Sequence, residues 1–222
     1  MEKIINTVKK YKIIPLVIAL IFNTIAYNGT RIITTSKYHY DITSPIDNLI
    51  PVIPATIIIY LGCYLYWLVN YVIGAGQEDD EAYKFLSADL FAKLICMVIF
   101  IAFPTTNTRP VLEDEGFFTE VLKMLYQIDA ADNLFPSIHC LTSWFCLIAV
   151  RKNPNIKTVY KIISVIITVA ICVSTLTTRQ HVIVDVAGGI ALAEFSYMIV
   201  DKIGFTRIYQ RSMKYIEQRI SR

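Results

Sequence analysis

The sequence has few charged residues for its length, and this shortage is the first guide to its class. Lys, Arg, Asp and Glu make up only 18% of its 222 residues, whereas 55% are hydrophobic. The mean hydropathy of +0.51 is higher than that of ordinary soluble domains. The composition therefore indicates a protein that folds in a membrane.

The chain also lacks the cysteine patterns of zinc sites and disulfide frameworks. Its five cysteines lie inside apolar runs, and none of them forms a Cys-x-x-Cys pair, so we interpret them as small core residues. Gly/Ser-rich linkers, low-complexity segments and internal repeats are absent as well. Residues 1–222 are therefore expected to form a single membrane domain.

What the sequence has in abundance is apolar runs long enough to cross a bilayer. A membrane-spanning helix needs about 20 mostly apolar residues, and six stretches approach that length: 13–27, 49–74, 85–103, 136–150, 159–176 and 181–200. They predict an all-α fold, an integral membrane bundle of six helices. No small-x-small cleavage site follows the basic N-terminus, so the first span is expected to stay uncleaved. Asp89 and Lys93 lie four apart in the third run and can pair on one helical face.

Basic residues predict the orientation of this bundle. They concentrate before the first run, between the fourth and fifth, and after the sixth: Lys3, Lys9, Lys10 and Lys12; Arg151, Lys152 and Lys157; and six residues from Lys202 to Arg222. Because cytoplasmic segments are enriched in Lys and Arg, both termini of this multi-pass cell-membrane protein are expected in the cytoplasm. The basic C-terminal tail suits anionic lipids and needs no nucleic-acid partner.

A polar loop from Thr105 to Phe135 follows the third run. Its residues 116–128 place apolar side chains at helical spacing beside polar ones. They predict an amphipathic helix, either at the membrane interface or packed on the protein itself. Asn133, close to Pro136, is a candidate helix-capping residue or a residue that supports the site from behind, and Asp129 and Asp132 are interpreted as loop acids without a catalytic role.

Two of the three histidines stand where polar loops meet apolar runs. His139 opens the fourth run, and His181 opens the sixth. On a helix His181 and Asp185 share a face, so the carboxylate can accept the ring N–H and leave the other ring nitrogen free. Because an intramembrane Asp is costly and usually functional, the pair predicts a nucleophile or base. The alternative is a structural His–Asp pair that joins two helices.

Arg109 and Ser137 are expected on the same side of the membrane as the two histidines, at the non-cytoplasmic ends of runs three, four and six. A guanidinium binds phosphate oxygens, and Pro136–Ser137 starts a helix whose free N–H groups favour an anion. With His139 as proton donor, this set can support phosphoryl transfer without a metal or cofactor.

The sixth run carries three further residues of note. Glu194 lies deep in the apolar run and needs a partner or a polar cavity, as a structural contact or as part of a substrate path. Gly188 and Gly189 are expected to permit close helix packing just below the two histidines.

These residues fall into three ordered motifs that resemble the type 2 phosphatidic acid phosphatase family. The motifs are TRP at 108–110, PSIH at 136–139, and the spaced Ser174, His181 and Asp185, and the resemblance covers roughly residues 85–200. That family shares its core with vanadium-dependent haloperoxidases and includes membrane lipid phosphatases. The resemblance implies that His181 is a phosphohistidine nucleophile oriented by Asp185. It also implies that His139 is the general acid and that Arg109 and Ser137 bind phosphate.

The chain departs from the family pattern at two phosphate-binding cations. A Lys usually stands seven residues before the Arg of the first motif, where this chain has Ala102, and an Arg usually follows the Ser of the third, where it has Thr175. Arg179 is a candidate replacement in substrate binding, with an interfacial lipid anchor as the alternative. The segments TTRQHVIVD and DAADNLFPSIH look closer to inositol phosphorylceramide and sphingomyelin synthases, which transfer a phospho-headgroup between lipids.

The predicted function is hydrolysis of a lipid phosphate or lipid diphosphate at the non-cytoplasmic membrane face, through a phosphohistidine intermediate. A lipid phospho-headgroup transferase with the same residues is the first alternative, and a six-span transporter or scaffold is the second. A metal site built from His139, His181 and Asp185 is a further alternative. The expected partners are the bilayer and the lipid-linked phosphate, and the sequence indicates no oligomeric state.

Overall fold

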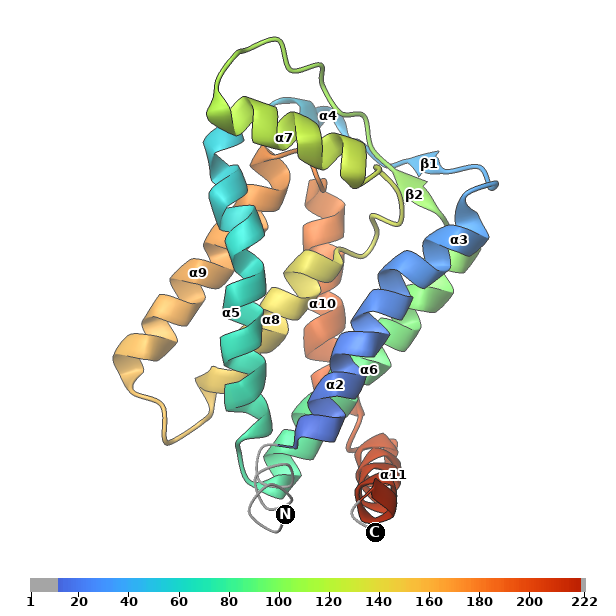
Figure 1. Cartoon of the computed structure of the whole chain (residues 1–222), viewed down its shortest axis with the longest axis vertical. Coiled ribbons are helices and arrows are strands. Elements are labelled where there is room, and N and C mark those ends of the chain that lie inside the picture. Colours follow the sequence, from blue (N-terminus) through green and yellow to red (C-terminus); the bar gives the residue numbers. More distant parts are fainter. Residues whose placement is uncertain (1–11, 221–222) are drawn as a thin grey trace.

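The computed structural model describes residues 12–220, without the side chain of Ile220. The predicted orientation also uses Lys3, Lys9, Lys10 and Arg222, which lie outside the described residues. Within them, each of the six apolar runs contains a helix, and the helices form a bundle (Figure 1). The long helices are α2 (Ile13–Thr24), α5 (Ile57–Ala75), α6 (Asp79–Ala102), α8 (Ile138–Arg151), α9 (Thr158–Thr177) and α10 (Ile183–Ile199).

Helix α2 continues through a π-helical turn, η1 (Ile25–Gly29), into α3 (Thr30–Thr34). The prediction ended this span at residue 27. The helix runs further because threonine hydroxyls bond to the carbonyls of the preceding turn: Thr30 Oγ1 donates to Ala26 O at 2.7 Å and Thr34 Oγ1 to Thr30 O at 3.1 Å. Such bonds satisfy polar side chains inside a helix.

The bounds of the second and third helices also differ from the prediction. The second helix begins at Ile57, after the short 3-10 helix η2 (Pro54–Thr56), and not at residue 49. Pro51 and Pro54 explain this difference, because proline lacks the N–H that a helix interior needs. Helix α6 begins at Asp79 and not at residue 85, because Asp79, Asp80 and Glu81 in its first turn suit the positive end of a helix dipole.

Four helices are long and apolar enough to cross a membrane, namely Ile13–Thr34, Pro54–Ala75, Asp79–Ala102 and Thr158–Thr177, and they are compatible with a membrane protein. Large apolar side chains are exposed on their outer faces, for example Leu68 on α5 and Ile166 on α9. Helix α8 has 14 residues and is therefore only about 21 Å long, shorter than a bilayer core. The count of six spans remains a prediction.

Helix α8 lies in the middle of the bundle and packs against α5, α6, α9 and α10. Its buried Leu141 and Phe145 join Phe85 and Phe100 of α6 in the main apolar core. Gly189 brings α10 close to α8, since a Cβ at this position would lie 2.6 Å from the carbonyl oxygen of Ser137. The expectation of close packing at this glycine is confirmed.

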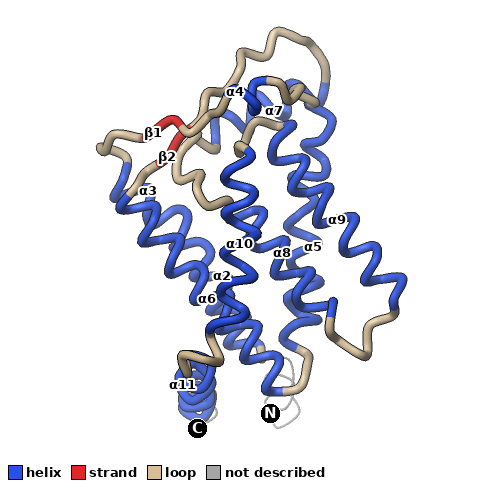
Figure 2. Tube along the Cα trace, turned by 180° about the vertical axis from the view of Figure 1, so that it is seen from behind, coloured by secondary structure: helices blue, strands red, loops and turns tan. Residues whose placement is uncertain are grey.

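The remaining elements gather at the two ends of the bundle. Figures 1 and 2 show α4 (Pro45–Asn48), α7 (Phe117–Ile128) and the parallel pair β1 (Tyr40–Asp41) and β2 (Thr105–Thr106) at one end. The start of α2, the α8–α9 loop and α11 (Phe205–Ile220) lie at the opposite end. The first residues of α8 and α10 therefore point to the end that α7 covers.

Helix α7 confirms the amphipathic helix predicted for this loop. Leu122 and Thr119 are buried, and α7 packs against η2 and α5. Phe117, Met124 and Ile128 remain exposed on the opposite side. The helix thus packs on the bundle while it presents an apolar face outward, so both interpretations of it retain support.

Two polar groups of the apolar runs have structural partners. Lys93 Nζ donates to Asp89 Oδ2 at 2.8 Å, as predicted, and both residues are buried. Glu194 accepts hydrogen bonds from Arg151 and, at 2.7 Å, from Trp144 Nε1. Glu194 is therefore a contact between α10 and α8, which favours the structural of its two interpretations. The five cysteines are buried and free, in agreement with their assignment to the core.

Candidate active site

The chain reverses between α9 and α10, and this turn positions His181. Arg179 adopts a left-handed backbone conformation with φ 54°. The N–H groups of Gln180 and His181 then both donate to the carbonyl of Thr175 at 3.0 Å. The turn holds the His181 backbone against the last turn of α9, immediately before α10 begins at Ile183.

Asp185 orients the His181 ring from the first turn of α10. Its Oδ2 atom lies 3.2 Å from His181 Nδ1 and accepts the Val182 N–H at 3.1 Å. Asp185 is fully buried, and His181 is 6% exposed. Because an ionised carboxylate only accepts hydrogen bonds, the proton of a neutral His181 belongs on Nδ1 and the lone pair on Nε2. The predicted pair is present, and its free nitrogen has the electronic form of a nucleophile or base.

The start of α8 is joined to the same helix. Ser137 Oγ caps α8 by accepting the Cys140 N–H at 3.2 Å, and the Ser137 N–H donates to the backbone carbonyl of Asp185 at 3.1 Å. Ser137 is thus fixed beside the His181–Asp185 pair. The first N–H groups of a helix have no partner within it, so this end of α8 offers donors to an anion.

His139 follows in the first turn of α8 and faces His181, with the ring centroids 5.8 Å apart. Tyr60 stacks on the His139 ring at 4.6 Å, and Trp67 lies 5.4 Å away. The Nε2 atom of His139 is buried without a hydrogen-bond partner among the described residues. Aromatic packing therefore holds an imidazole with a free nitrogen next to His181.

Arg109 lies in the loop after α6, beside the turn that carries His181. Its guanidinium donates to Gln180 Oε1 at 2.8 Å and to the Asp129 carbonyl at 2.6 Å. It also stacks on the ring of Tyr126, 4.6 Å from the ring centroid. Arg109 therefore bonds to Gln180, the residue directly before His181, and links the loop after α6 to the end of α7 and to the turn between α9 and α10. The contact between Arg109 and a phosphate oxygen remains a prediction.

The guanidinium of Arg179 binds backbone carbonyls at the end of α4. Its guanidinium donates to the carbonyls of Asp47 at 2.5 Å and Ile50 at 2.8 Å, where it closes the end of α4. Only its Nε atom lacks a partner in the described part of the chain. The geometry supports a structural role for Arg179 more directly than the predicted role in substrate binding.

Unpartnered polar atoms concentrate on these loops and helix ends. Six buried side-chain N and O atoms at this site have no hydrogen-bond partner within residues 12–220. They are Asn107 Oδ1, Arg109 Nε, His139 Nε2, Arg179 Nε, Gln180 Nε2 and Asp185 Oδ1. Buried polar atoms are normally paired, so such a cluster indicates a ligand or water. Three of the six are N–H donors from Arg and Gln, as a site for an anion requires.

A cavity of about 390 Å³ opens beside His139, and it contains residues that the sequence did not single out. Arg31 of α3 lines it together with Asp129 and Tyr27. The Arg31 guanidinium bonds to Asp132 at 3.0 Å and approaches Asp129 at 3.5 Å, and the Tyr27 hydroxyl donates to Asp129. The sequence did not predict these contacts because the residues that form them are about 100 positions apart, and Arg31 belongs to no local motif.

The loop before Ser137 is tied to α3 in the same way. Asn133, buried and with φ 50°, donates from Nδ2 to Thr30 Oγ1 at 2.9 Å. Of the two predicted roles of Asn133, capping is wrong because Ser137 caps α8, whereas its bond to Thr30 fits a residue that supports the loop before the site. Burial raises the pKa of Asp132, although the Arg31 charge acts in the opposite direction.

Asp47 is a second residue that sequence reasoning missed. Its Oδ1 atom accepts the N–H of Ile183, the first residue of α10, at 2.8 Å. Its Oδ2 atom accepts from the backbone N–H of Ser44 at 2.8 Å. Asp47 therefore caps α4 and fixes it to the start of α10, two residues after His181.

Ala102 and Thr175 stand at the two positions where the family pattern has cations. Ala102 is the last residue of α6 and is exposed. Thr175 is buried, and its carbonyl is the acceptor that holds His181. No group of three His, Cys, Asp or Glu side chains within residues 12–220 is arranged to hold a metal ion.

The fold and the site first define a class: an all-helical protein with helices of membrane-spanning length and two facing histidines at one end. A family model described as PAP2 superfamily matches residues 55–199, which is 145 of the 222 residues. The chain therefore belongs to the PAP2 superfamily, as its motifs indicated, and this membership supports a phosphatase-type activity. The matched region begins at α5, which supplies Tyr60 and Trp67 beside His139. No curated protein and no solved structure matches the chain.

Proposed function

We propose that the protein removes phosphate from a lipid phosphate or lipid diphosphate at the non-cytoplasmic face of the membrane. The observation that carries this proposal is the oriented His181–Asp185 pair facing His139 amid unpartnered buried N–H donors. Phosphoryl transfer needs an in-line nucleophile, a proton donor for the leaving oxygen and stabilisation of negative charge. The site offers a candidate for each requirement.

In the proposed first step, His181 Nε2 attacks phosphorus and a P–N bond forms as the P–O bond to the lipid breaks. His139, protonated at this stage, gives its proton to the departing lipid oxygen. Asp185 accepts a hydrogen bond from the Nδ1–H group, which keeps its proton, and stabilises the positive charge on His181. In the second step His139 takes a proton from water, the water oxygen attacks phosphorus, and the P–N bond breaks. For a lipid phosphate the products are the lipid alcohol and inorganic phosphate, whereas a lipid diphosphate attacked at its terminal phosphorus gives a lipid phosphate and inorganic phosphate.

The arrangement of charges supports the proposed membrane side. Lys12, Arg151 and Lys157 lie near the bundle end opposite α7, as does α11 with its basic residues (Figure 1). His139 and His181 lie towards the end that α7 covers. Because positive charge accumulates on cytoplasmic segments, this separation favours cytoplasmic termini and a non-cytoplasmic site.

The proposal is tested by phosphate release from phosphatidic acid by purified protein in detergent. His181→Ala is expected to abolish release, and His139→Ala to lower kcat by about 10²- to 10⁴-fold, the usual contribution of general acid catalysis. His39→Ala is the matched control, since His39 lies on the loop before β1 and bonds to the Lys37 carbonyl. Turnover of the His181→Ala protein at the wild-type rate would refute the proposed nucleophile.

A headgroup transferase is the second candidate, and the cavity beside His139 is the observation in its favour. Its 390 Å³ and its Asp129 carboxylate offer room and a hydrogen-bond acceptor for a second hydroxyl compound. In this case the acceptor hydroxyl replaces water in the second step. Product analysis with and without a diacylglycerol or ceramide acceptor separates the two reactions, because a transferase yields a new phospholipid and little free phosphate.

A further inference from the structure

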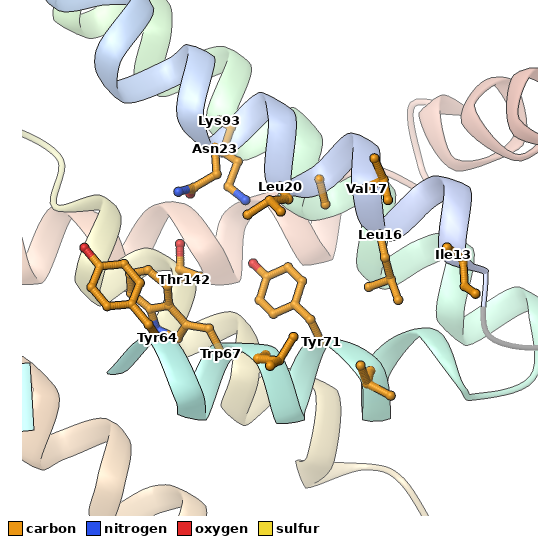
Figure 3. Close-up of a pocket in the computed structure, with 13 residues that line it drawn as sticks. Ile13, Leu16, Val17, Leu20, Asn23, Tyr64, Trp67, Tyr71, Lys93 and Thr142 are labelled. Carbon is orange, nitrogen blue, oxygen red and sulfur yellow. The ribbon is translucent and has the colours of Figure 1, made fainter. Parts of the chain in front are cut away.

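A second cavity continues from the one beside His139. It measures about 410 Å³ and lies between α2 and α5 (Figure 3). Four residues line both cavities, namely Leu20, Asn23, Tyr64 and Trp67. The two cavities therefore adjoin, and we treat them together as a path from His139 down the bundle. Both volumes are typical of small-molecule sites, which range over about 300–1,000 Å³.

The far part of this path suits a hydrocarbon chain. Its walls include Ile13 and Val17 from α2 and Leu68 and Val72 from α5. Val17, Leu20 and Leu68 are also exposed on the outer surface of the bundle, where a bilayer would contact them. A lipid tail can therefore extend from this part of the path into the membrane without leaving an apolar environment.

The near part of the path contains a polar cluster that a hydrocarbon chain cannot satisfy. Figure 3 shows Asn23, Lys93 and Thr142 at the level where Tyr64 and Tyr71 reach across from α5. Asn23 Oδ1 and Thr142 Oγ1 are buried. Among residues 12–220, Asn23 Oδ1 has no hydrogen-bond partner, and Thr142 Oγ1 has none in good geometry, although the Tyr71 hydroxyl interacts with it. Lys93 Nζ bonds to Asp89, which leaves further N–H donors of the ammonium group.

The distance of this cluster from the histidines is set by α8. Thr142 lies three residues after His139, on the next turn of the helix, so the two Cα atoms differ by about 4.5 Å along its axis. A group that bonds to Thr142 while the phosphate lies at His139 is therefore only a few covalent bonds from the phosphorus atom.

We infer that the substrate carries a carbonyl, amide or hydroxyl group within a few bonds of its phosphate and that Asn23, Lys93 and Thr142 bind this group. Glycerolipid esters and sphingolipid amides have this chemistry, whereas isoprenoid phosphates have only hydrocarbon at that distance. The inference rests on the proposed function and narrows its substrate class. Thr142 and Lys93 supply donors for a carbonyl oxygen, and Asn23 Oδ1 accepts from an amide or hydroxyl.

An isoprenoid chain in this path would leave the same atoms buried and unpaired, a situation that enzymes use to reject substrates lacking a polar group. We therefore expect kcat/KM for a carbonyl-bearing lipid phosphate to exceed that for an isoprenyl phosphate by at least roughly ten-fold, which corresponds to about 1.4 kcal/mol. The preference is expected to depend on Thr142 and Asn23.

The test compares phosphate release from phosphatidic acid, ceramide phosphate and farnesyl phosphate at equal surface concentration in detergent micelles. Wild type is compared with Thr142→Val, which keeps the shape of the side chain, and with Asn23→Leu. Ser196→Ala is the matched control, because Ser196 Oγ is another buried, unpartnered hydroxyl but belongs to α10 and lines neither cavity.

The expected result is a loss of the preference in both path variants: slower turnover of the carbonyl-bearing lipid, and faster turnover of farnesyl phosphate because an apolar side chain leaves no unpaired polar atom beside the isoprenoid chain. Faster cleavage of phosphatidic acid or of ceramide phosphate tells which linkage the cluster prefers, and either supports the inference. Equal rates on all three lipids, or equal losses on all three in the variants, would overturn it while leaving the proposed function intact. No release from any of the three lipids would overturn the proposed function as well.

Discussion

Adding a single methyl group at Gly189 is expected to separate the two halves of the site. In a Gly189→Ala variant the new Cβ would lie 2.6 Å from the Ser137 carbonyl oxygen, 3.1 Å from Leu141 N and 3.3 Å from Cys140 Cβ. Ordinary contacts of a Cβ begin at 3.4 Å, so α8 and α10 must move apart by about 0.8 Å at this point. The Ser137 N–H to Asp185 carbonyl bond, 3.1 Å long, lies across the same gap and is lengthened.

The expected cost has a structural and a catalytic part. Overpacking of this kind destabilises a protein by about 1–3 kcal/mol, and a displacement near 1 Å between catalytic groups can lower a rate by about 10²-fold. Thermal unfolding and phosphate release are measured on the same detergent-purified sample. The larger effect is expected in kcat, because His139 lies on α8 and the His181 ring is oriented by Asp185 of α10, and these two helices separate.

Gly62→Ala is the matched control for this experiment. Gly62 lies in α5, and a Cβ built there meets no atom within 4 Å, so alanine should stabilise the helix by about 0.5–1 kcal/mol. Its activity should stay at the wild-type level. If Gly189→Ala retains kcat within two-fold of wild type, the close approach of α8 and α10 does not set the geometry of the site, and our reasoning fails.

Three further predictions concern single groups and the absence of a metal requirement. Asp47→Asn should lower thermal stability at neutral pH: burial raises the Asp47 pKa, but hydrogen bonds from Ser44 and Ile183 outweigh this and lower it below its ordinary value of 3.8. The carboxylate therefore stabilises the fold above pH 3.8, and the difference between wild type and variant in a pH series of melting curves should vanish as the pH falls below the lowered pKa; a constant difference would contradict this. Arg109→Lys should lower kcat/KM by at least about ten-fold, since lysine cannot bond to Gln180 and the Asp129 carbonyl with a planar fork; an unchanged kcat/KM for phosphatidic acid would show that this fork is dispensable. Excess EDTA should leave phosphate release unchanged, and loss of activity that Mg²⁺ or Zn²⁺ restores would point to a metal enzyme instead.

The sequence predicted those parts of the fold and site that depend on local spacing. Apolar runs located all six helices, because burial in an apolar solvent depends on continuous stretches of side chains. The His181–Asp185 pair was predicted from the four-residue repeat of one helix face; the pair is present, but His181 precedes α10, and Asp185 reaches it from the first turn of that helix. The start of α8 agrees with the helix predicted to begin at Pro136–Ser137, although the structure shows that Ser137 and not Asn133 is the capping residue.

Features that depend on contacts between distant segments were not predictable in this way. The guanidinium of Arg179 turns towards the carbonyls of Asp47 and Ile50 because the left-handed backbone at Arg179 reverses the chain. An arginine gives no indication in the sequence that its backbone adopts this conformation. Arg31 meets Asp129 and Asp132 across nearly half of the chain. A single sequence contains no periodic signal for such pairs.

The matched family region starts at residue 55, yet one wall of the path that leads to His139 is built by α2, which ends at Thr24. Mutations in α2 can therefore reshape the path without altering any residue of the region that carries the family signature. Substitutions in α2, natural or engineered, could therefore change which ligand the path prefers while the catalytic residues stay the same.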